Sequence, residues 1–159
     1  IDEGSCAAFG TPTWPHLRPE LEPWLKDLPG LILEDMTQKP DAFAAMDGAI
    51  AASGTVTLEL AAARVPHCIG YKVAPLTALI GRAMLKTPFV NLINILAKKP
   101  VVPELLQEQC RSDKLYAAIH DAVLSPDQQH QTFDQVMPTL SPPNETEMAQ
   151  LIINRKAVI

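Results

Sequence analysis

The stretch Asp47-Gly-Ala-Ile-Ala-Ala-Ser-Gly-Thr-Val-Thr-Leu-Glu59 decides the fold class of this chain. Its first half is a short apolar run typical of a buried strand, the Ser53-Gly54 pair predicts a turn, and the following residues begin a helix. A helix that begins where a strand ends presents unpaired backbone N–H groups and the positive end of its dipole. The stretch therefore predicts an α/β fold in which phosphate binds at a helix start.

The side chains of this stretch fit the same chemistry. Gly54 has no side chain to block a close approach, and three hydroxyl groups, on Ser53, Thr55 and Thr57, surround it in sequence. Glu59 lies one turn into the predicted helix, where its carboxylate can accept hydrogen bonds from a pair of sugar hydroxyls. An ordinary strand-to-helix turn with Ser53 as N-cap explains the spacing equally well.

Apolar runs alternate with helical periodicity along the rest of the chain. Strands are expected at 7–13, 31–33, 47–52 and 67–73. Helices are expected at 17–28, 40–45, 55–64, 75–85, 103–109, 113–123, 126–137 and 145–154. Residues 35–39 are expected as loop, and 89–95 as either a strand or an extended loop. This alternation predicts an α/β, Rossmann-like parallel sheet with helices on both faces.

Composition limits the class of protein. The chain has 159 residues, 47% of them hydrophobic and 19% charged, which is typical of one folded domain. Its net charge of −5 argues against non-specific nucleic-acid binding. The three cysteines, Cys6, Cys68 and Cys110, are widely spaced and predict neither a disulfide framework nor a zinc site. With no signal peptide and no apolar run near the roughly 20 residues of a membrane span, a cytoplasmic location is expected.

Five sequence blocks carry a family resemblance. They are 52–61, 71–77, 86–90, 94–97 and 102–107. Their order and spacing resemble those of lipid-A-disaccharide synthases, which are inverting, metal-independent glycosyltransferases of the two-domain GT-B type. Such enzymes transfer 2,3-diacylglucosamine from its UDP donor to 2,3-diacylglucosamine 1-phosphate and release UDP. Because the chain begins with Ile and not Met, the resemblance implies that 1–159 is a partial, single UDP-sugar-binding domain, the carboxyl-terminal half, without the amino-terminal acceptor domain.

The resemblance also implies a set of contacts to the UDP-sugar. The loop around Met36 is expected to face the uracil, by likeness to the peptidoglycan N-acetylglucosaminyltransferase, although Met36 packing beneath the loop is an open alternative. The 53–59 stretch is expected at the diphosphate and ribose. A third group, which consists of Asn94, Glu104 and Gln107, is expected to bind sugar hydroxyls or phosphate. The residues implied are Met36, Ser53, Gly54, Thr55, Thr57, Glu59, Asn94, Glu104 and Gln107.

No catalytic base is identified among these residues. His67 falls in a predicted buried strand, and His16, His120 and His130 lie outside the matched blocks, so all four are expected to be structural or solvent-facing. The resemblance implies that the base belongs to the absent domain, that no cofactor or metal takes part, and that the isolated chain is inactive.

The chain departs from the family pattern at two points, neither of which lies in the 53–59 stretch. The chain has Asn91-Leu-Ile-Asn94 where the family usually has Ser-Leu-Pro-Asn, which removes a fixed φ angle before Asn94. Lys72 stands where arginine is common, and lysine makes no bidentate contact.

Partners follow from the same resemblance. They are the UDP-diacylglucosamine donor, a lipid acceptor held by the missing domain, and the inner membrane of a Gram-negative bacterium as a peripheral surface; a homodimer stays open. A basic cluster of Lys72, Arg82, Lys86, Lys98 and Lys99 suits an anionic membrane, although a core-packed amphipathic helix with snorkelling lysines explains it too. Two rival functions are another UDP-sugar transferase, such as the peptidoglycan enzyme, and a non-catalytic nucleotide-binding module.

Overall fold

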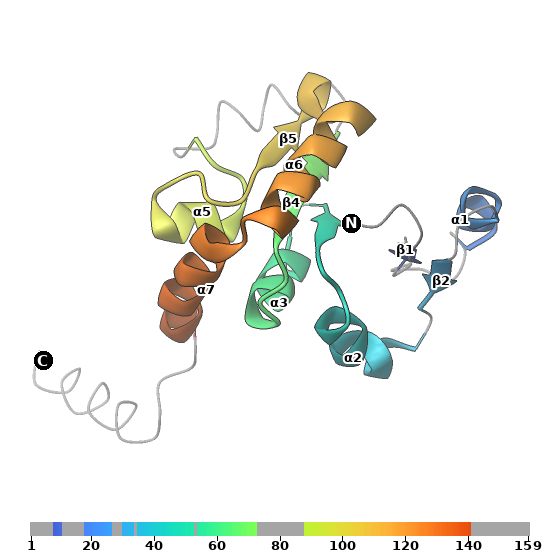
Figure 1. The fold of residues 1–159 in the computed structure, drawn as a ribbon, viewed down its shortest axis with the longest axis horizontal. Helices are drawn as coiled ribbons and strands as arrows, with labels where there is room; N and C mark the ends of the chain where they lie inside the picture. The colour runs from blue at the N-terminus through green and yellow to red at the C-terminus, as the bar shows by residue number, and fades with distance from the viewer. Residues whose placement is uncertain are drawn as a thin grey trace, which may run out of the picture. The chain divides into compact units, whose positions relative to one another are not determined.

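A computed structural model describes residues 8–10, 18–26, 30–33, 35–52, 54–72 and 88–140 of the chain. The chain divides into two compact units, 1–47 and 48–159, each of which is described by itself (Figure 1). The helices expected at 75–85 and 145–154, together with Ser53 and His16, lie outside the described residues.

The first unit contains a pair of parallel strands. β1 (Ala8–Gly10) pairs with β2 (Gly30–Ile32), so that Ala8 lies opposite Gly30 and Gly10 opposite Ile32. α1 (Arg18–Leu25) connects the two strands and continues for two residues beyond Pro23. A strand, a helix and a parallel strand form the βαβ unit that the sequence predicts.

Residues 35–39 are not the loop that the sequence predicts, because most of them form a 3₁₀ helix. The Asp35 carboxylate accepts hydrogen bonds from the Thr37 backbone nitrogen at 2.9 Å and the Thr37 hydroxyl at 2.6 Å. These bonds lower the pKa of Asp35 and nucleate the 3₁₀ helix η2 (Met36–Gln38). η2 runs directly into α2 (Lys39–Ala44), whose first turn accommodates Pro40.

The second unit is built on an open three-stranded parallel sheet in the order β3-β4-β5. Its strands are β3 (Ala49–Ala51), β4 (His67–Tyr71) and β5 (Glu104–Leu106). Ala51 and Glu104 both lie opposite Ile69, on either side of the central strand. The strands expected around β3 and β4 are confirmed, each shorter than predicted.

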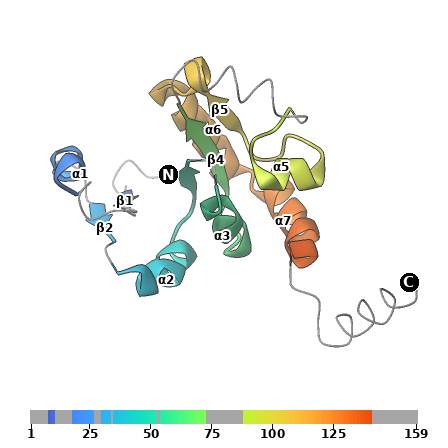
Figure 2. The ribbon, with the colours of Figure 1, turned by 180° about the vertical axis from the view of Figure 1, so that it is seen from behind.

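Helices cover both faces of this sheet, as predicted. α6 (Ser112–Leu124) packs against β4 and β3 on one face and lies in front of β4 in Figure 1. The turned view in Figure 2 has α6 behind the sheet and α3 in front. α3 (Val56–Ala62), α5 (Leu92–Ala97) and α7 (Asp127–Leu140) pack against one another. Their core consists of Ala61, Ile69, Ile93, Val102, Phe133 and Val136.

Two glycines allow α6 to lie close to the sheet. A methyl group at Gly70 would lie 2.8 Å from Cδ2 of Leu115, and one at Gly48 would lie 2.5 Å from Cγ2 of Val123. Gly70 thus marks a close approach between a strand and the helix that covers it.

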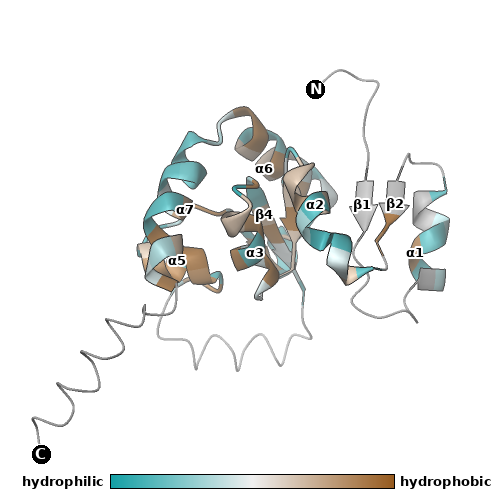
Figure 3. Cartoon of the chain, turned by 90° about the horizontal axis from the view of Figure 1, so that it is seen from below, coloured by the Kyte–Doolittle hydropathy of each residue, from teal (hydrophilic) through white to brown (hydrophobic). Residues whose placement is uncertain are grey.

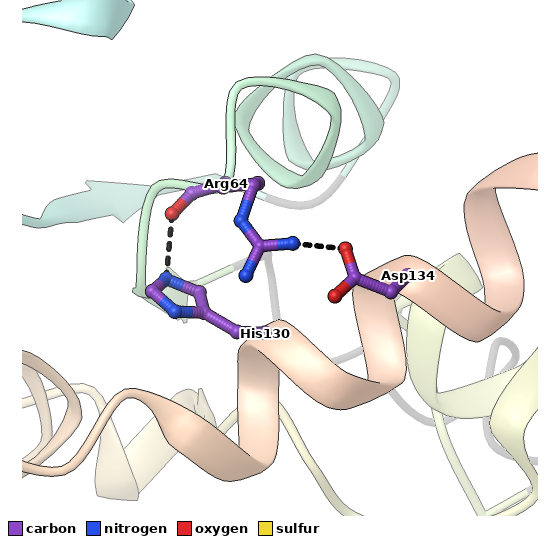
Figure 4. Close-up of polar contacts among 3 residues, drawn as sticks. All are labelled: Arg64, His130 and Asp134. Carbon is purple, nitrogen blue, oxygen red and sulfur yellow. Dashed lines mark hydrogen bonds and ion pairs between the residues drawn. The ribbon is translucent and has the colours of Figure 1, made fainter.

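α7 is held to the sheet by polar contacts at its first turns. The Gln129 side chain accepts a hydrogen bond from the His67 nitrogen at 2.9 Å and donates one to the His67 carbonyl at 3.0 Å. The His130 ring bonds the carbonyl of Arg64 at 2.8 Å, and the Arg64 guanidinium pairs with Asp134 (Figure 4). Figure 3 shows that α7 carries both hydrophilic and hydrophobic residues, as a helix with one buried face requires.

Two other predicted elements are wrong. Residues 89–95 contain a helix start, because the Asn91 side chain caps α5 by accepting a hydrogen bond from the Ile93 nitrogen at 2.8 Å. Residues 103–109 form β5 followed by the 3₁₀ helix η3 (Gln107–Gln109). Pro103 was expected to open a helix, but its carbonyl accepts a hydrogen bond from the Ile69 nitrogen at 2.8 Å and begins sheet pairing.

Candidate functional site

The candidate site lies at the edge of the second unit's sheet where its strands end. All three strands are parallel, so Ala51, Tyr71 and Leu106 end at one edge. Gly54 follows β3 and Gln107 follows β5, with β4 between them. Ligands of open α/β sheets bind at this edge.

Gly54 has the backbone conformation and the surroundings that a close approach requires. Its φ is +137°, a value that residues with side chains rarely adopt. Among the described residues, and apart from its two chain neighbours, no heavy atom lies within 4 Å of the position that a Cβ at Gly54 would occupy. Within the described part of the chain, the turn before α3 is therefore open at this point.

The side chains at the start of α3 divide into outward and inward groups. Thr55, the N-cap residue, is exposed and makes no side-chain cap hydrogen bond, and Glu59 is exposed in the first turn. Thr57 is 1% exposed, and its hydroxyl donates to the Gly54 carbonyl at 2.8 Å. Thr57 thus stabilises the turn in this structure, and a contact from its hydroxyl to a ligand stays a prediction.

Asn94 is completely buried on α5, where its side chain joins α5 to the segment that enters β5. Its amide oxygen accepts hydrogen bonds from the nitrogens of Val101 and Val102, both at 2.9 Å. Its amide nitrogen donates to the Val102 carbonyl at 2.7 Å and to Glu104 Oε1 at 2.8 Å. Both donors and both acceptor positions of the amide are therefore used within the fold.

Glu104, the first residue of β5, is bonded in the same network. Its Oε2 accepts a hydrogen bond from the Val90 nitrogen at 3.0 Å. Its Oε1 accepts from the Asn91 nitrogen at 3.0 Å in addition to the Asn94 amide. The predicted pair of Asn94 and Glu104 thus comes together, in contact with backbone and with each other.

Gln107 is placed differently from these two residues. It follows β5 directly, is half-buried, and has a φ of +51°, which is uncommon for a residue other than glycine. Its carbonyl accepts a hydrogen bond from the Cys110 nitrogen at 3.1 Å, which closes the η3 turn. Gln107 is therefore the member of the third group that lies beyond a strand end.

Asn91 is a residue of this region that the sequence interpretation missed. It is 1% exposed, and its Nδ2 has no hydrogen-bond partner within the described part of the chain. Its cap also explains the departure from the family's proline: the Ile93 N–H, which a proline lacks, bonds the Asn91 side chain. An asparagine before the apolar Leu-Ile-x-Ile-Leu pattern is the helix-start signal that identifies it.

The remaining two predicted contacts are Met36 and Ser53. Met36 belongs to the first unit, where its side chain is 51% exposed in η2, so packing beneath the loop is not what the structure shows. Ser53 lies outside the described residues.

The buried histidine and cysteine are parts of the core. His67 is stacked on Phe133 and bonds the Val65 carbonyl through Nδ1 at 2.9 Å; burial lowers its pKa. Burial, with a smaller effect of Cys110, raises the pKa of Cys68 to about 11, which makes this thiol unreactive. The expectation that His67 is structural is confirmed.

The described ranges contain neither a metal-binding cluster nor a membrane-spanning helix. Within them, no group of three or more His, Cys, Asp or Glu side chains is arranged to hold a metal ion. None of the helices there combines the length and apolarity of a membrane span.

Fold and site together define a class of protein. The open parallel sheet, the helices on both faces and the helix start at the carboxyl edge are those of a Rossmann-like α/β half of a GT-B protein. Residues 25–152 match the family described as lipid-A-disaccharide synthetase. The chain belongs to this family.

Curated relatives are named lipid-A-disaccharide synthase. The relative from Gluconobacter oxydans (strain 621H) is 44% identical over 115 residues, which are 70% of this chain and 28% of the relative. That from Paramagnetospirillum magneticum is 53% identical over 94 residues, 58% of this chain and 24% of the relative. That from Pseudomonas fluorescens is 36% identical over 141 residues, 87% of this chain and 37% of the relative. The chain thus spans between 24% and 37% of these relatives' length.

Proposed function

We propose that this chain supplies the UDP-sugar site of a lipid-A-disaccharide synthase, a glycosyltransferase of lipid A biosynthesis. In the whole protein, 2,3-diacylglucosamine passes from UDP to 2,3-diacylglucosamine 1-phosphate with inversion, giving the lipid A disaccharide and UDP, without a metal or cofactor. The observation that carries the proposal is the open turn at Gly54, at the start of α3, in a chain whose family match spans 25–152.

The proposed binding mode follows from the geometry of the strand ends. The diphosphate lies against the Ser53–Thr55 turn, where backbone N–H groups, the dipole of α3 and the Thr55 hydroxyl stabilise its charge. The exposed Glu59 carboxylate accepts hydrogen bonds from the ribose hydroxyls. Gln107 binds the phosphate or the sugar from the end of β5.

The transfer itself needs two kinds of assistance. The fixed N–H groups of this chain stabilise the negative charge that develops on the UDP leaving group. A general base must take the proton of the acceptor hydroxyl. The described histidines either bond within the fold, as His67 and His130 do, or lie on α6, as His120 does. We therefore assign the base and the lipid acceptor to a domain outside this chain, and expect the isolated chain to be inactive.

The proposed location and partners follow the family. The whole enzyme acts at the cytoplasmic side of the inner membrane of a Gram-negative bacterium, where both lipid substrates reside, and binds that surface peripherally. The exposed Lys72, Lys98 and Lys99 fit an anionic lipid surface. A homodimer remains compatible with this arrangement.

Calorimetric titration of UDP into this chain tests the proposal. We expect Glu59→Ala to weaken UDP binding by about 1–3 kcal/mol, because hydrogen bonds to a charged group are lost. UDP lacking both ribose hydroxyls should bind the parent chain and Glu59→Ala equally well. Asp121→Ala, which removes an exposed carboxylate on α6, is the matched control and should bind UDP like the parent chain.

Four results would contradict the proposal in whole or in part. UDP binding that is undetectable in the folded parent chain would remove the nucleotide site. An unchanged UDP affinity in Glu59→Ala would remove the ribose contact. Turnover of both lipid substrates by this chain alone would show that the catalytic base lies within it. A preference for UDP-N-acetylglucosamine over UDP-diacylglucosamine in the whole enzyme would favour the peptidoglycan-type reaction instead.

A further inference from the structure

The network around Asn94 and Glu104 suggests a role other than ligand contact for these two residues. Asn94 is fully buried and makes four hydrogen bonds, and the Glu104 carboxylate accepts three. A direct contact from Asn94 to a ligand would require one of its bonds to be broken inside the protein, where an unpaired polar group costs stability.

The network fixes the position at which β5 begins. Asn94 holds the Val101 and Val102 nitrogens through one oxygen atom. The next residue, Pro103, bonds the central strand through its carbonyl, and Glu104 then joins β5 to the segment before α5. Residues 101–104 are therefore bonded to α5, to the residues just before α5 and to β4.

Because β5 is short, the position at which it begins also determines where Gln107 lies at the candidate site. β5 has three residues, and Gln107 follows it at the carboxyl edge with a φ of +51°. A residue in this sparsely populated conformation persists only where its surroundings hold it. A shift of β5 along β4 would therefore move Gln107 along the carboxyl edge of the sheet.

We propose that Asn94 and Glu104 are positioning residues, which act on nucleotide binding through the placement of Gln107 and do not touch the ligand. This inference rests on the proposed function, since it takes UDP as the ligand and Gln107 as a contact. All three residues were expected to contact the ligand; in this inference Gln107 alone does so, and Asn94 and Glu104 hold it in place.

A double-mutant cycle on UDP affinity tests the inference. Glu104→Gln keeps the shape of the side chain but replaces one acceptor oxygen by an NH₂ group that faces N–H donors. We expect Glu104→Gln to raise the Kd for UDP about tenfold, equivalent to one lost hydrogen bond. In a Gln107→Ala background the same substitution should change the Kd less than twofold. Glu108→Gln, an exposed carboxylate on η3, is the matched control and should leave the Kd unchanged.

The outcomes separate this inference from a purely structural role. A lower unfolding temperature with an unchanged Kd in Glu104→Gln would show that the network only stabilises the fold. Additive effects of Glu104→Gln and Gln107→Ala, or a Gln107→Ala variant that binds UDP like the parent chain, would also overturn the inference. Absence of UDP binding in the parent chain would instead contradict the proposed function.

A measurement on the unsubstituted chain covers the case in which Glu104→Gln does not fold. In ¹H–¹⁵N NMR spectra we expect UDP to shift the side-chain amide signal of Gln107 and to give it intermolecular NOEs. The Asn94 side-chain amide should show no NOE to UDP and should remain protected from hydrogen exchange. An NOE between UDP and the Asn94 amide would refute the positioning role.

Discussion

The two connections that flank the central strand use similar polar residues in opposite ways. Before α3, the turn after β3 leaves Gly54 open and Thr55 and Glu59 exposed. Between α5 and β5, Asn94 and Glu104 are bonded to backbone and to each other. From this difference in burial and hydrogen bonding, we expect ligand contacts at the connection before α3 and a supporting role for the polar residues between α5 and β5.

The largest effect is expected at Gly54, in the connection from β3 to α3. Gly54→Val forces a β-branched residue into a φ near +137° and fills the space through which the diphosphate approaches. We expect no detectable UDP binding by calorimetry. Gly48→Ala is the control, since its methyl group would press on Val123 and lower stability while the folded protein still binds UDP. Parent-like binding by Gly54→Val would show that the ligand lies elsewhere.

In the connection from α5 to β5, substitutions are expected to act mainly on stability. Asn94→Leu removes all four hydrogen bonds and leaves the buried Val102 nitrogen without its acceptor, while the Val101 nitrogen keeps only its bond to the Lys99 carbonyl, so we expect a loss of about 2–4 kcal/mol in the free energy of unfolding. Urea titration followed by circular dichroism measures it. Gln109→Leu, which alters an exposed amide, should change stability by less than about 0.5 kcal/mol. Equal effects of the two substitutions would contradict the closed network.

The buried His67 sharpens the comparison, because it is a polar group of the interior that is not fully bonded. Its Nε2 has no partner within the described part of the chain, and burial lowers its pKa from 6.5. The folded state therefore binds fewer protons than the unfolded state below this pH. We expect the stability that His67 contributes to be present at neutral pH and to fall as the pH drops below about 6.5, by at most about 1.4 kcal/mol per pH unit.

Urea titrations at several pH values check this expectation for His67. His67→Phe retains a ring stacked on Phe133 and removes the titration, so it should show a weaker loss of stability on acidification. His130→Gln is the control for a partly exposed ring. Parallel pH curves for the parent chain and His67→Phe would show that the loss has another source.

The smallest effect is expected at the exposed ion pair of Arg64 with Asp134. Both side chains are more than half exposed, at 52% and 55%, so Asp134→Ala should cost less than about 1 kcal/mol of unfolding free energy. Arg64 also has a φ of +57°, so Arg64→Gly relieves backbone strain and should come out closer to neutral than Arg64→Ala. A thermal melt in high salt should remove most of the Asp134→Ala effect. A loss well above 1 kcal/mol would mean that this pair is shielded from solvent.

Several features of the fold could be predicted from local sequence. The apolar run before Ser53-Gly54 predicted β3, the helical period after Thr55 predicted α3, and the repeated alternation predicted a parallel sheet with helices on both faces. The burial of His67 followed from its place in a predicted apolar strand. Five motif blocks were enough to predict the family.

Other features depended on contacts between distant parts of the chain. Residues 103–109 look like a helix that begins at proline, but the edge of β4 at Ile69 pairs with them and makes them a strand. The assignment of Asn94 and Glu104 to a ligand came from their motif, whereas their bonds to residues 90, 91, 101 and 102 appear only when α5 packs beside β5.

The sequence by itself therefore determined the family, the α/β class and the glycine turn, because periodicity, turn chemistry and motif spacing are local properties of a chain. Only the tertiary structure decided which polar side chains remain available to a ligand. Hydrogen-bond donors and acceptors are used up by whatever lies next to them in space: Asn94 and Thr57 find their partners inside the protein, whereas Thr55 is exposed and makes no side-chain cap hydrogen bond.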